Sequence, residues 1–199
     1  MLPRPVFNLF SSVYNEFARV KNGKKLFDDG LNIRNKLYSQ ELNVGDYIVV
    51  YGAGGTRTCA ACFKLDKSLK DMVIDQTIYY YVTDSEDEAL YLTGMLNSSA
   101  VSEANAAYQA EGALGRRHIH TLPSTSVPRY NPSDPFHKEM SQVTSDVIRM
   151  IEQSVGAKLL DPNLGSVSVR RSKIYKILDS TDKYEYSNEI AFRILSQQA

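Results

Sequence analysis

Hydrophobic residues fall into short, regular runs from about residue 46 onward. Runs rich in β-branched and aromatic residues predict strands over 46–51, 59–65 and 72–82. In the third run Ile74, Ile78, Tyr80 and Val82 alternate onto one face, as expected for a strand. Three strands in succession predict a small antiparallel or mixed sheet.

After the third run, the apolar residues take the spacing of a helix. Ser85 and Glu88 form the pattern of a capping box, in which the Ser85 hydroxyl accepts the Glu88 amide proton and the Glu88 carboxylate reaches back. We expect this helix to end near residues 97–98, and a second helix to cover 99–110. The acidic residues of the first turn lie at the positive end of the helix dipole, so we interpret them as structural rather than metal-binding or catalytic.

A longer helix is expected towards the C-terminus. Asp134 is a good N-cap with Pro135 at the first helical position, and the helix is predicted to run to about Val155. One stripe of this helix is apolar and consists of Met140, Val143, Val147 and Ile151.

The ends of the chain carry weaker patterns. Residues 1–40 are polar and basic, and their sequence leaves helix and strand both open. Turn-forming residues at 161–165 separate a C-terminal tail that holds another helix at about 183–197. We therefore expect an α+β fold, with a small sheet packed against several helices over 1–160 and a helical extension over 161–199.

Composition places the chain among soluble globular proteins. The 199 residues are 43% hydrophobic and 23% charged, which excludes disordered, collagen-like and disulfide-scaffold classes. No stretch is apolar enough for a membrane span, and the first 20 residues lack the pattern of a signal peptide. With only two cysteines, the chain suits a reducing compartment, so we expect a cytoplasmic protein with no membrane partner.

The net charge is zero, with 23 basic and 23 acidic side chains, but the charge is unevenly distributed. Residues 1–40 carry a net +4, residues 76–103 a net −5, and residues 104–130 a net +2. A uniformly basic nucleic-acid binder is therefore excluded, whereas one face can still meet an anion while another repels it. Ordinary solvated faces are the alternative interpretation.

A glycine-rich turn follows the first predicted strand. It does not match a dinucleotide-binding fingerprint, because Arg57 stands where the third glycine belongs, and no Gly-Lys-Ser/Thr follows it as a phosphate-binding P-loop requires. Gly54, Gly55, Thr56 and Arg57 together offer a flexible backbone, a hydroxyl and a guanidinium, which can grip a phosphate or a base edge. A plain hairpin turn is the alternative.

A second basic segment follows a break at Gly112 and Gly115. Its alternation predicts a short strand over 117–122, directly after Arg116. This segment carries the candidate anion-binding or nucleic-acid-binding side chains Arg116, Arg117, His118 and His120. The two histidines could instead ligate a metal, but no carboxylate or cysteine lies at helpful spacing.

Other motifs carry little chemistry. Cys59 and Cys62 fall in a predicted strand, which would point them to opposite faces, so we interpret them as small buried hydrophobes rather than a redox or zinc pair. Asn131 to Asp134 is interpreted as a turn and helix cap. No nucleophile elbow, kinase motif set or zinc-protease motif is present.

The order of features between residues 74 and 140 is more specific than any of them alone. A strand leads into Glu88-Ala89-Leu90-Tyr91-Leu92 and Leu96-Asn97-Ser98, then into Gly115-Arg116-Arg117-His118-Ile119-His120, Leu122-Pro123, Val127-Pro128-Arg129-Tyr130 and Pro135-Phe136-His137. This ordered set resembles the C-terminal part of adenine-N6 DNA methyltransferases from restriction–modification systems, over about residues 45–155.

The resemblance implies a target recognition domain, which holds duplex DNA while a separate catalytic domain binds S-adenosylmethionine and methylates a flipped adenine. This chain shows neither a glycine-rich motif for that cofactor nor the catalytic Asn-Pro-Pro-aromatic motif, so we expect it to hold no cofactor or metal and not to methylate alone. The resemblance also implies that Leu92, Leu96 and Asn97 define the fold rather than contact DNA. The implied DNA-binding residues are Arg116, Arg117, His118, His120, Thr56, Arg57, Gly54 and Gly55.

Two other function classes stay open. The apolar stripe from Met140 to Ile151 could dock on the catalytic domain or on a second copy, which would make the chain a protein-interaction module. An independent small-molecule enzyme is the third possibility, although the sequence offers no set of nucleophile and base for it.

Overall fold

A computed structural model describes residues 40–52, 58–69, 72–74, 78–106, 110–112, 115–117, 127–159 and 166–197. The chain forms two compact units, Met1–Glu41 with Asp71–Gln76, and Leu42–Lys70 with Thr77–Ala199. In the first unit the Gln40 side chain bonds both backbone groups of Ile74: its Nε2 donates to the carbonyl at 2.7 Å, and its Oε1 accepts from the amide at 2.9 Å. All the elements below belong to the second unit.

The second unit contains an antiparallel sheet in the order β2-β1-β3. The strands are β1 (Tyr47–Gly52), β2 (Ala60–Lys64) and β3 (Ile78–Thr83). Val49 in the central strand pairs with Cys62 on one side and Tyr81 on the other, and it packs into the main core. The predicted α+β class, with a small antiparallel sheet and several helices, is confirmed.

The third strand is shorter than the sequence predicts, because it begins at Ile78 rather than at residue 72. Residues 72–74 are extended but form no strand. The physical reason is visible at Ile74, whose amide and carbonyl are both bonded by the Gln40 side chain instead of by a neighbouring strand.

The helix α2 (Glu86–Asn97) begins as predicted at its N-cap, where the Ser85 hydroxyl accepts the Glu88 amide proton at 3.2 Å. The prediction that the Glu88 carboxylate reaches back to the N-cap backbone is wrong. The Ser85 amide donates to the Thr83 hydroxyl at 3.1 Å, and the Glu88 carboxylate accepts from Thr83 and from the Tyr81 hydroxyl. Strand β3 supplies these partners because it ends directly beside the first turn of α2.

Three further helices complete the described C-terminal half. They are α5 (Pro135–Leu159), α6 (Val167–Leu178) and α7 (Asp182–Ser196). Asp134 caps α5 as predicted, accepting the Phe136 amide proton at 2.8 Å. The predicted end of α5 near Val155 is four residues too early, since Ala157, Lys158 and Leu159 are good helix formers.

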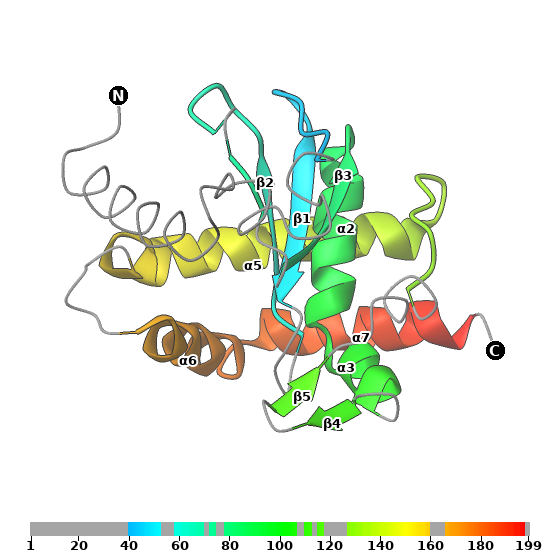
Figure 1. The fold of residues 1–199 in the computed structure, drawn as a ribbon. Helices are drawn as coiled ribbons and strands as arrows, with labels where there is room; N and C mark the ends of the chain where they lie inside the picture. Colours follow the sequence, from blue (N-terminus) through cyan, green and yellow to red (C-terminus); the bar gives the residue numbers. More distant parts are fainter. Residues whose placement is uncertain are drawn as a thin grey trace, which may run out of the picture. The chain divides into compact units, whose positions relative to one another are not determined.

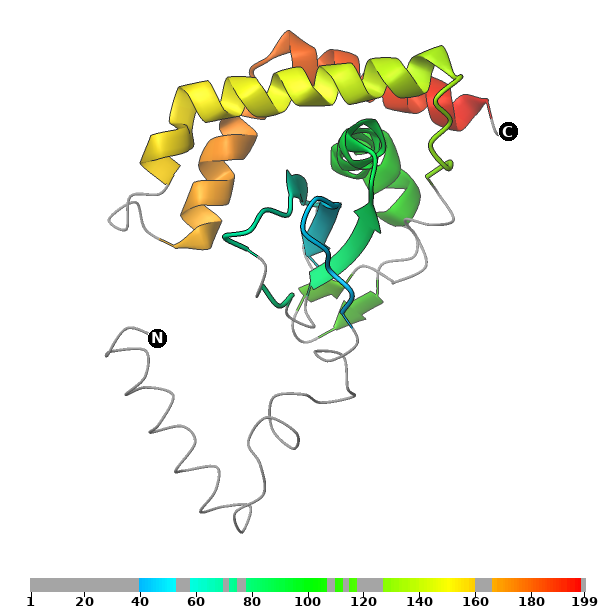
Figure 2. The same ribbon diagram turned by 90° about the horizontal axis from the view of Figure 1, so that it is seen from above.

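A central helix lies between the sheet and the outer helices. Figure 2 shows the sheet, then α2, then α5 and α7 as successive layers, and α2 contacts all three strands of the sheet as well as α5 and α7. The fully buried side chains Tyr91 and Met95 of α2 meet Met140 of α5 and Ile190 of α7 in one core. The C-terminal segment is thus helical and α7 shares this core, while the predicted boundary at residue 160 stays a prediction.

Close contact between α2 and α5 depends on Gly94. A Cβ atom at this position would lie 2.1 Å from the Thr144 Oγ1 and 2.6 Å from the Met140 Sδ. Neither separation is compatible with van der Waals radii, so the two helices pack at a distance that only glycine permits at this crossing. Among the described residues, no helix is both long enough and apolar enough to cross a membrane.

Candidate nucleic-acid interface

Two of the predicted DNA-binding residues lie on a short β-hairpin. A helix α3 (Ser99–Ala106) follows α2, and the chain then forms β4 (Ala110–Gly112) and β5 (Gly115–Arg117). The strands pair antiparallel, with Glu111 opposite Arg116 and Ala110 opposite Arg117. The expected helix over 99–110 is therefore wrong at its last residue, because Ala110 belongs to β4; residues 107–109 lie outside the described part of the chain.

Only the backbone of this hairpin is described. Arg116 and Arg117 are adjacent in β5, which begins at Gly115, two residues before the predicted strand over 117–122. The remaining predicted residues lie outside the described part of the chain; they are His118, His120, Gly54, Gly55, Thr56 and Arg57. Their proximity to one another and to β5 stays a prediction.

The acidic cluster at the start of α2 has partners from the sheet. The Tyr47 hydroxyl donates to the Glu86 carboxylate at 3.0 Å, and the Tyr81 hydroxyl donates to Glu88 at 3.2 Å. Burial, followed by the negative charge of Glu88, raises the pKa of Tyr81. These contacts confirm that the carboxylates hold the strand–helix junction together.

The chain that returns to α5 is fixed by a buried histidine. His137 is 5% exposed, and its Nδ1 accepts the Asn131 amide proton at 2.9 Å. Its ring stacks on Tyr91, with ring centres 4.5 Å apart, and the Tyr91 hydroxyl donates to the Pro128 carbonyl at 3.0 Å. Burial lowers the pKa of His137, and the nearby Asp134 carboxylate opposes that shift. The neutral ring is thus a structural support for residues 128–131.

The free edge of the sheet is closed by a side chain of α2. The Asn97 side chain accepts the Ala60 amide proton through Oδ1 at 2.9 Å and donates to the Ala60 carbonyl through Nδ2 at 2.9 Å. A single amide group therefore replaces one residue of a neighbouring strand. With Leu96 buried in the core, these contacts give both residues the structural roles predicted for them.

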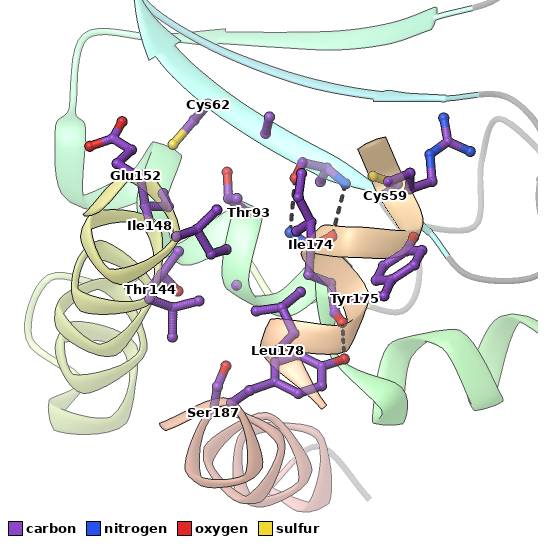
Figure 3. Close-up of a pocket in the computed structure, with 18 of the residues that line it drawn as sticks. Cys59, Cys62, Thr93, Thr144, Ile148, Glu152, Ile174, Tyr175, Leu178 and Ser187 are labelled. Atoms are coloured by element: carbon purple, nitrogen blue, oxygen red, sulfur yellow. Dashed lines mark hydrogen bonds between the residues drawn. The ribbon is translucent and has the colours of Figure 1, made fainter. Parts of the chain in front are cut away.

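An apolar cavity of about 500 Å³ lies between β2, α2, α5, α6 and α7. Figure 3 shows Thr144, Ile148 and Glu152 on the α5 side and Ile174, Tyr175 and Leu178 on the α6 side. Burial raises the pKa of the Cys62 thiol, although a hydrogen bond with Thr93 opposes the shift. A thiol that stays protonated is a poor nucleophile, so Cys62 is not activated for nucleophilic attack.

Both cysteines line this cavity, which differs from the expectation that they point to opposite faces. Cys59 precedes β2, so strand alternation does not apply to it. Both are free and half-buried rather than fully buried. Within the described ranges no group of three or more histidine, cysteine or carboxylate side chains is arranged to hold a metal ion.

The apolar stripe of α5 is not available as a docking surface. Met140 is fully buried in the main core, and Val147 is buried in a second cluster with Leu178 and Tyr184. Val143 and Ile151 are half-buried against the same clusters. The hypothesis that the chain docks on a partner through this stripe is therefore not supported, because the stripe packs against the chain's own hydrophobic clusters.

Sequence reasoning missed one basic element. It predicted no helix at α6, although the segment carries four basic side chains and no acidic one, namely Arg170, Arg171, Lys173 and Lys176. This run of charge was visible in the sequence. The alternation of Val167 and Val169 with serine resembles a strand start, which hid the helical spacing of the residues that follow.

Comparison with known proteins adds no relative. No protein-family model matches the chain, and no curated protein matches it significantly.

Proposed function

We propose that this chain is the DNA-binding target recognition domain of a site-specific adenine-N6 DNA methyltransferase or restriction–modification enzyme. It positions duplex DNA, and a separate catalytic domain that binds S-adenosylmethionine carries out the methylation. On this proposal the chain acts in the cytoplasm, and its partners are duplex DNA and the catalytic domain.

The adjacent arginines on the β4–β5 hairpin carry the proposal. A two-stranded β-ribbon fits the major groove of B-DNA, and arginine is the side chain that most often bonds guanine there in a bidentate manner. Arg116 lies opposite Glu111, whereas Arg117 lies opposite Ala110 and has no charged neighbour in the register. Because adjacent residues of a strand lie on opposite faces, the ribbon carries one arginine on each face, and each face has a guanidinium group for bases or phosphates.

The charge distribution also favours this surface. The acidic first turn of α2 lies at one end of that helix, whereas α3 and the hairpin follow from its other end. Figure 1 shows the hairpin at the lower end of the molecule and the start of α2, after β3, at the upper end. A duplex on the hairpin thus avoids the acidic cluster, which would repel its phosphates.

The experiment compares duplex binding by the intact chain and by the variant Arg116→Ala/Arg117→Ala. Binding is measured by fluorescence anisotropy between about 50 and 200 mM salt, where each neutralised phosphate contributes about 0.9 to the slope of log affinity against log salt. We expect the variant to bind more weakly, with a slope lower by up to about 2 if both arginines contact phosphates.

The matched control is Arg149→Ala/Lys183→Ala. It removes the same amount of charge from two exposed cations that already pair with Asp146, at 3.4 and 3.0 Å. We expect this control to keep the wild-type affinity and slope. Equal binding by the wild type and the Arg116/Arg117 variant would show that the hairpin is not the DNA-binding site.

A further inference from the structure

The helix α6 differs in charge from every other described helix. Its twelve residues contain four basic side chains and no acidic one, whereas α2, α3, α5 and α7 each contain acidic residues. The helix dipole favours cations only near a C-terminal end, which accounts for Lys176 but not for Arg170 and Arg171 near the start. Helix stability therefore does not explain this concentration of positive charge.

The orientation of α6 is fixed by its apolar face. Ile174 and Leu178 pack with Val147 and Tyr184 in the second hydrophobic cluster. Lys173 and Lys176 are spaced three residues apart and lie on the opposite face. Val169, four residues before Lys173, is 44% exposed, so this outer face is open to solvent.

The outer face of α6 carries two cations, Lys173 and Lys176. Among the residues that the structure describes, both are exposed and neither forms an ion pair. The contrast is Asp146 of α5, which holds both Arg149 and Lys183. Within the described ranges the charges of Lys173 and Lys176 are thus uncompensated and available to an external anion.

The helix also lies on the same side of the molecule as the proposed DNA-binding hairpin. In Figure 1 both α6 and β4–β5 lie below α5, away from the acidic start of α2, and in Figure 2 both again lie on one side of α5. A duplex has phosphates at regular intervals on either side of any groove it presents, so one rigid duplex can span two separate contact points.

We infer that the outer face of α6 binds the phosphate backbone of the duplex whose groove receives the β4–β5 hairpin. This inference rests on the proposed function and adds a second contact surface to it. Lysine provides a point charge on a flexible stem, which suits a phosphate contact without base specificity. The helix therefore contributes affinity and orientation, while the hairpin contributes sequence preference.

The test uses the full chain with Lys173→Gln/Lys176→Gln, which removes two exposed charges without disturbing the apolar face. We expect affinity to fall by roughly tenfold at 0.1 M salt, and the salt slope to fall by up to about 2. The loss should be the same for duplexes of every sequence, because phosphates carry no sequence information. The charge-reversed Lys173→Glu/Lys176→Glu should bind more weakly still.

Two comparisons separate this inference from the proposed function. If wild type binds duplex DNA and only the Arg116/Arg117 variant is weakened, α6 is not a DNA contact and the inference alone fails. If wild type binds no duplex even at low salt, the proposed function fails first. The control Arg149→Gln/Lys183→Gln must match wild type, since an equal loss there would indicate a general charge effect and would also overturn the inference.

Discussion

Gly94 of α2 determines how closely α2 and α5 approach each other in the core. The Thr144 hydroxyl occupies the space that a Cβ atom on Gly94 would need. That hydroxyl is buried and has no hydrogen-bond partner in the described part of the chain. The helix crossing therefore accepts an unsatisfied hydroxyl in exchange for tight packing. Gly156 in α5 makes no such contact, because its nearest neighbour to an added Cβ is 3.8 Å away.

We predict that Gly94→Ala destabilises the fold by about 1–3 kcal/mol, because the added methyl overpacks the crossing by more than the helix propensity of alanine recovers. The matched variant Gly156→Ala should instead be stabilising by up to about 1 kcal/mol. Urea unfolding followed by circular dichroism measures both. A neutral or stabilising Gly94→Ala would show that α2 and α5 are further apart than described.

His137 makes stability depend on pH. Burial lowers its pKa below the ordinary value of 6.5, so the unfolded chain binds a proton more tightly than the folded chain. Its contribution is complete above pH 6.5 and is lost as the pH falls through the lower pKa of the folded state. Protonation at Nδ1 would also break the bond from the Asn131 amide.

We therefore predict that the free energy of unfolding falls between about pH 7 and pH 5, and that His137→Asn reduces this dependence. The Asn Oδ1 can accept the Asn131 amide proton but does not titrate over this range. Urea midpoints of both proteins at several pH values provide the comparison. Parallel pH profiles would mean that His137 does not carry the effect.

At the scale of elements, the edge strand β2 depends on a helix for its hydrogen bonds. Asn97 at the end of α2 satisfies both backbone groups of Ala60. The Tyr184 hydroxyl of α7 donates to the Asn97 carbonyl at 2.9 Å, so the same residue also joins the C-terminal helix to the sheet edge. One asparagine thus connects three elements.

We predict that Asn97→Ala destabilises the fold by about 1–3 kcal/mol, since it leaves a part-buried amide and carbonyl without partners. The matched control is Asn188→Ala, because the Asn188 side chain accepts a single amide proton, from Ser99, at an exposed site. The control should cost less than about 1 kcal/mol. Equal losses in urea unfolding would argue against the special role of the strand edge.

The elements were predictable where local chemistry decides them. The Ser85 cap and the Asp134 cap each depend on neighbours within one helix turn, the apolar stripe of α5 depends on spacing along a single helix, and all three are confirmed. The bond from Thr83 to Glu88 was not predictable, because it requires the three-dimensional junction of β3 with α2. The predicted start of the third strand was wrong for the same reason, because the Gln40 side chain forms the hydrogen bonds of the Ile74 backbone.

The candidate site, too, was predictable from the sequence only in part. The sequence identified Arg116 and Arg117 from their residue types, and the structure adds the hairpin that carries them. It did not identify the outer face of α6, because the arrangement of Lys173 and Lys176 opposite Ile174 and Leu178 depends on the helix and on its packing against α5 and α7. Sequence alone shows charge, whereas only the fold shows which charges face outward.

At the largest scale that the structure describes, the second unit separates acidic groups from basic ones. Acidic groups at the start of α2 are bonded to tyrosines of the sheet, while basic groups on β5 and α6 lie on the other side of the fold. On the proposed function, such a distribution would orient an approaching polyanion, because one end of the second unit attracts it and the other repels it. The net charge of zero is therefore compatible with selective DNA binding.

The most direct measurement is selection of duplexes from a random DNA pool by the full chain at a low and a high salt concentration, read by sequencing. We predict enrichment of one short motif at both concentrations, and loss of that enrichment in the Arg116→Ala/Arg117→Ala variant, because base contacts persist when phosphate contacts are screened. Binding without any enriched motif would contradict sequence recognition by this chain. Absence of binding even at low salt would contradict DNA binding altogether.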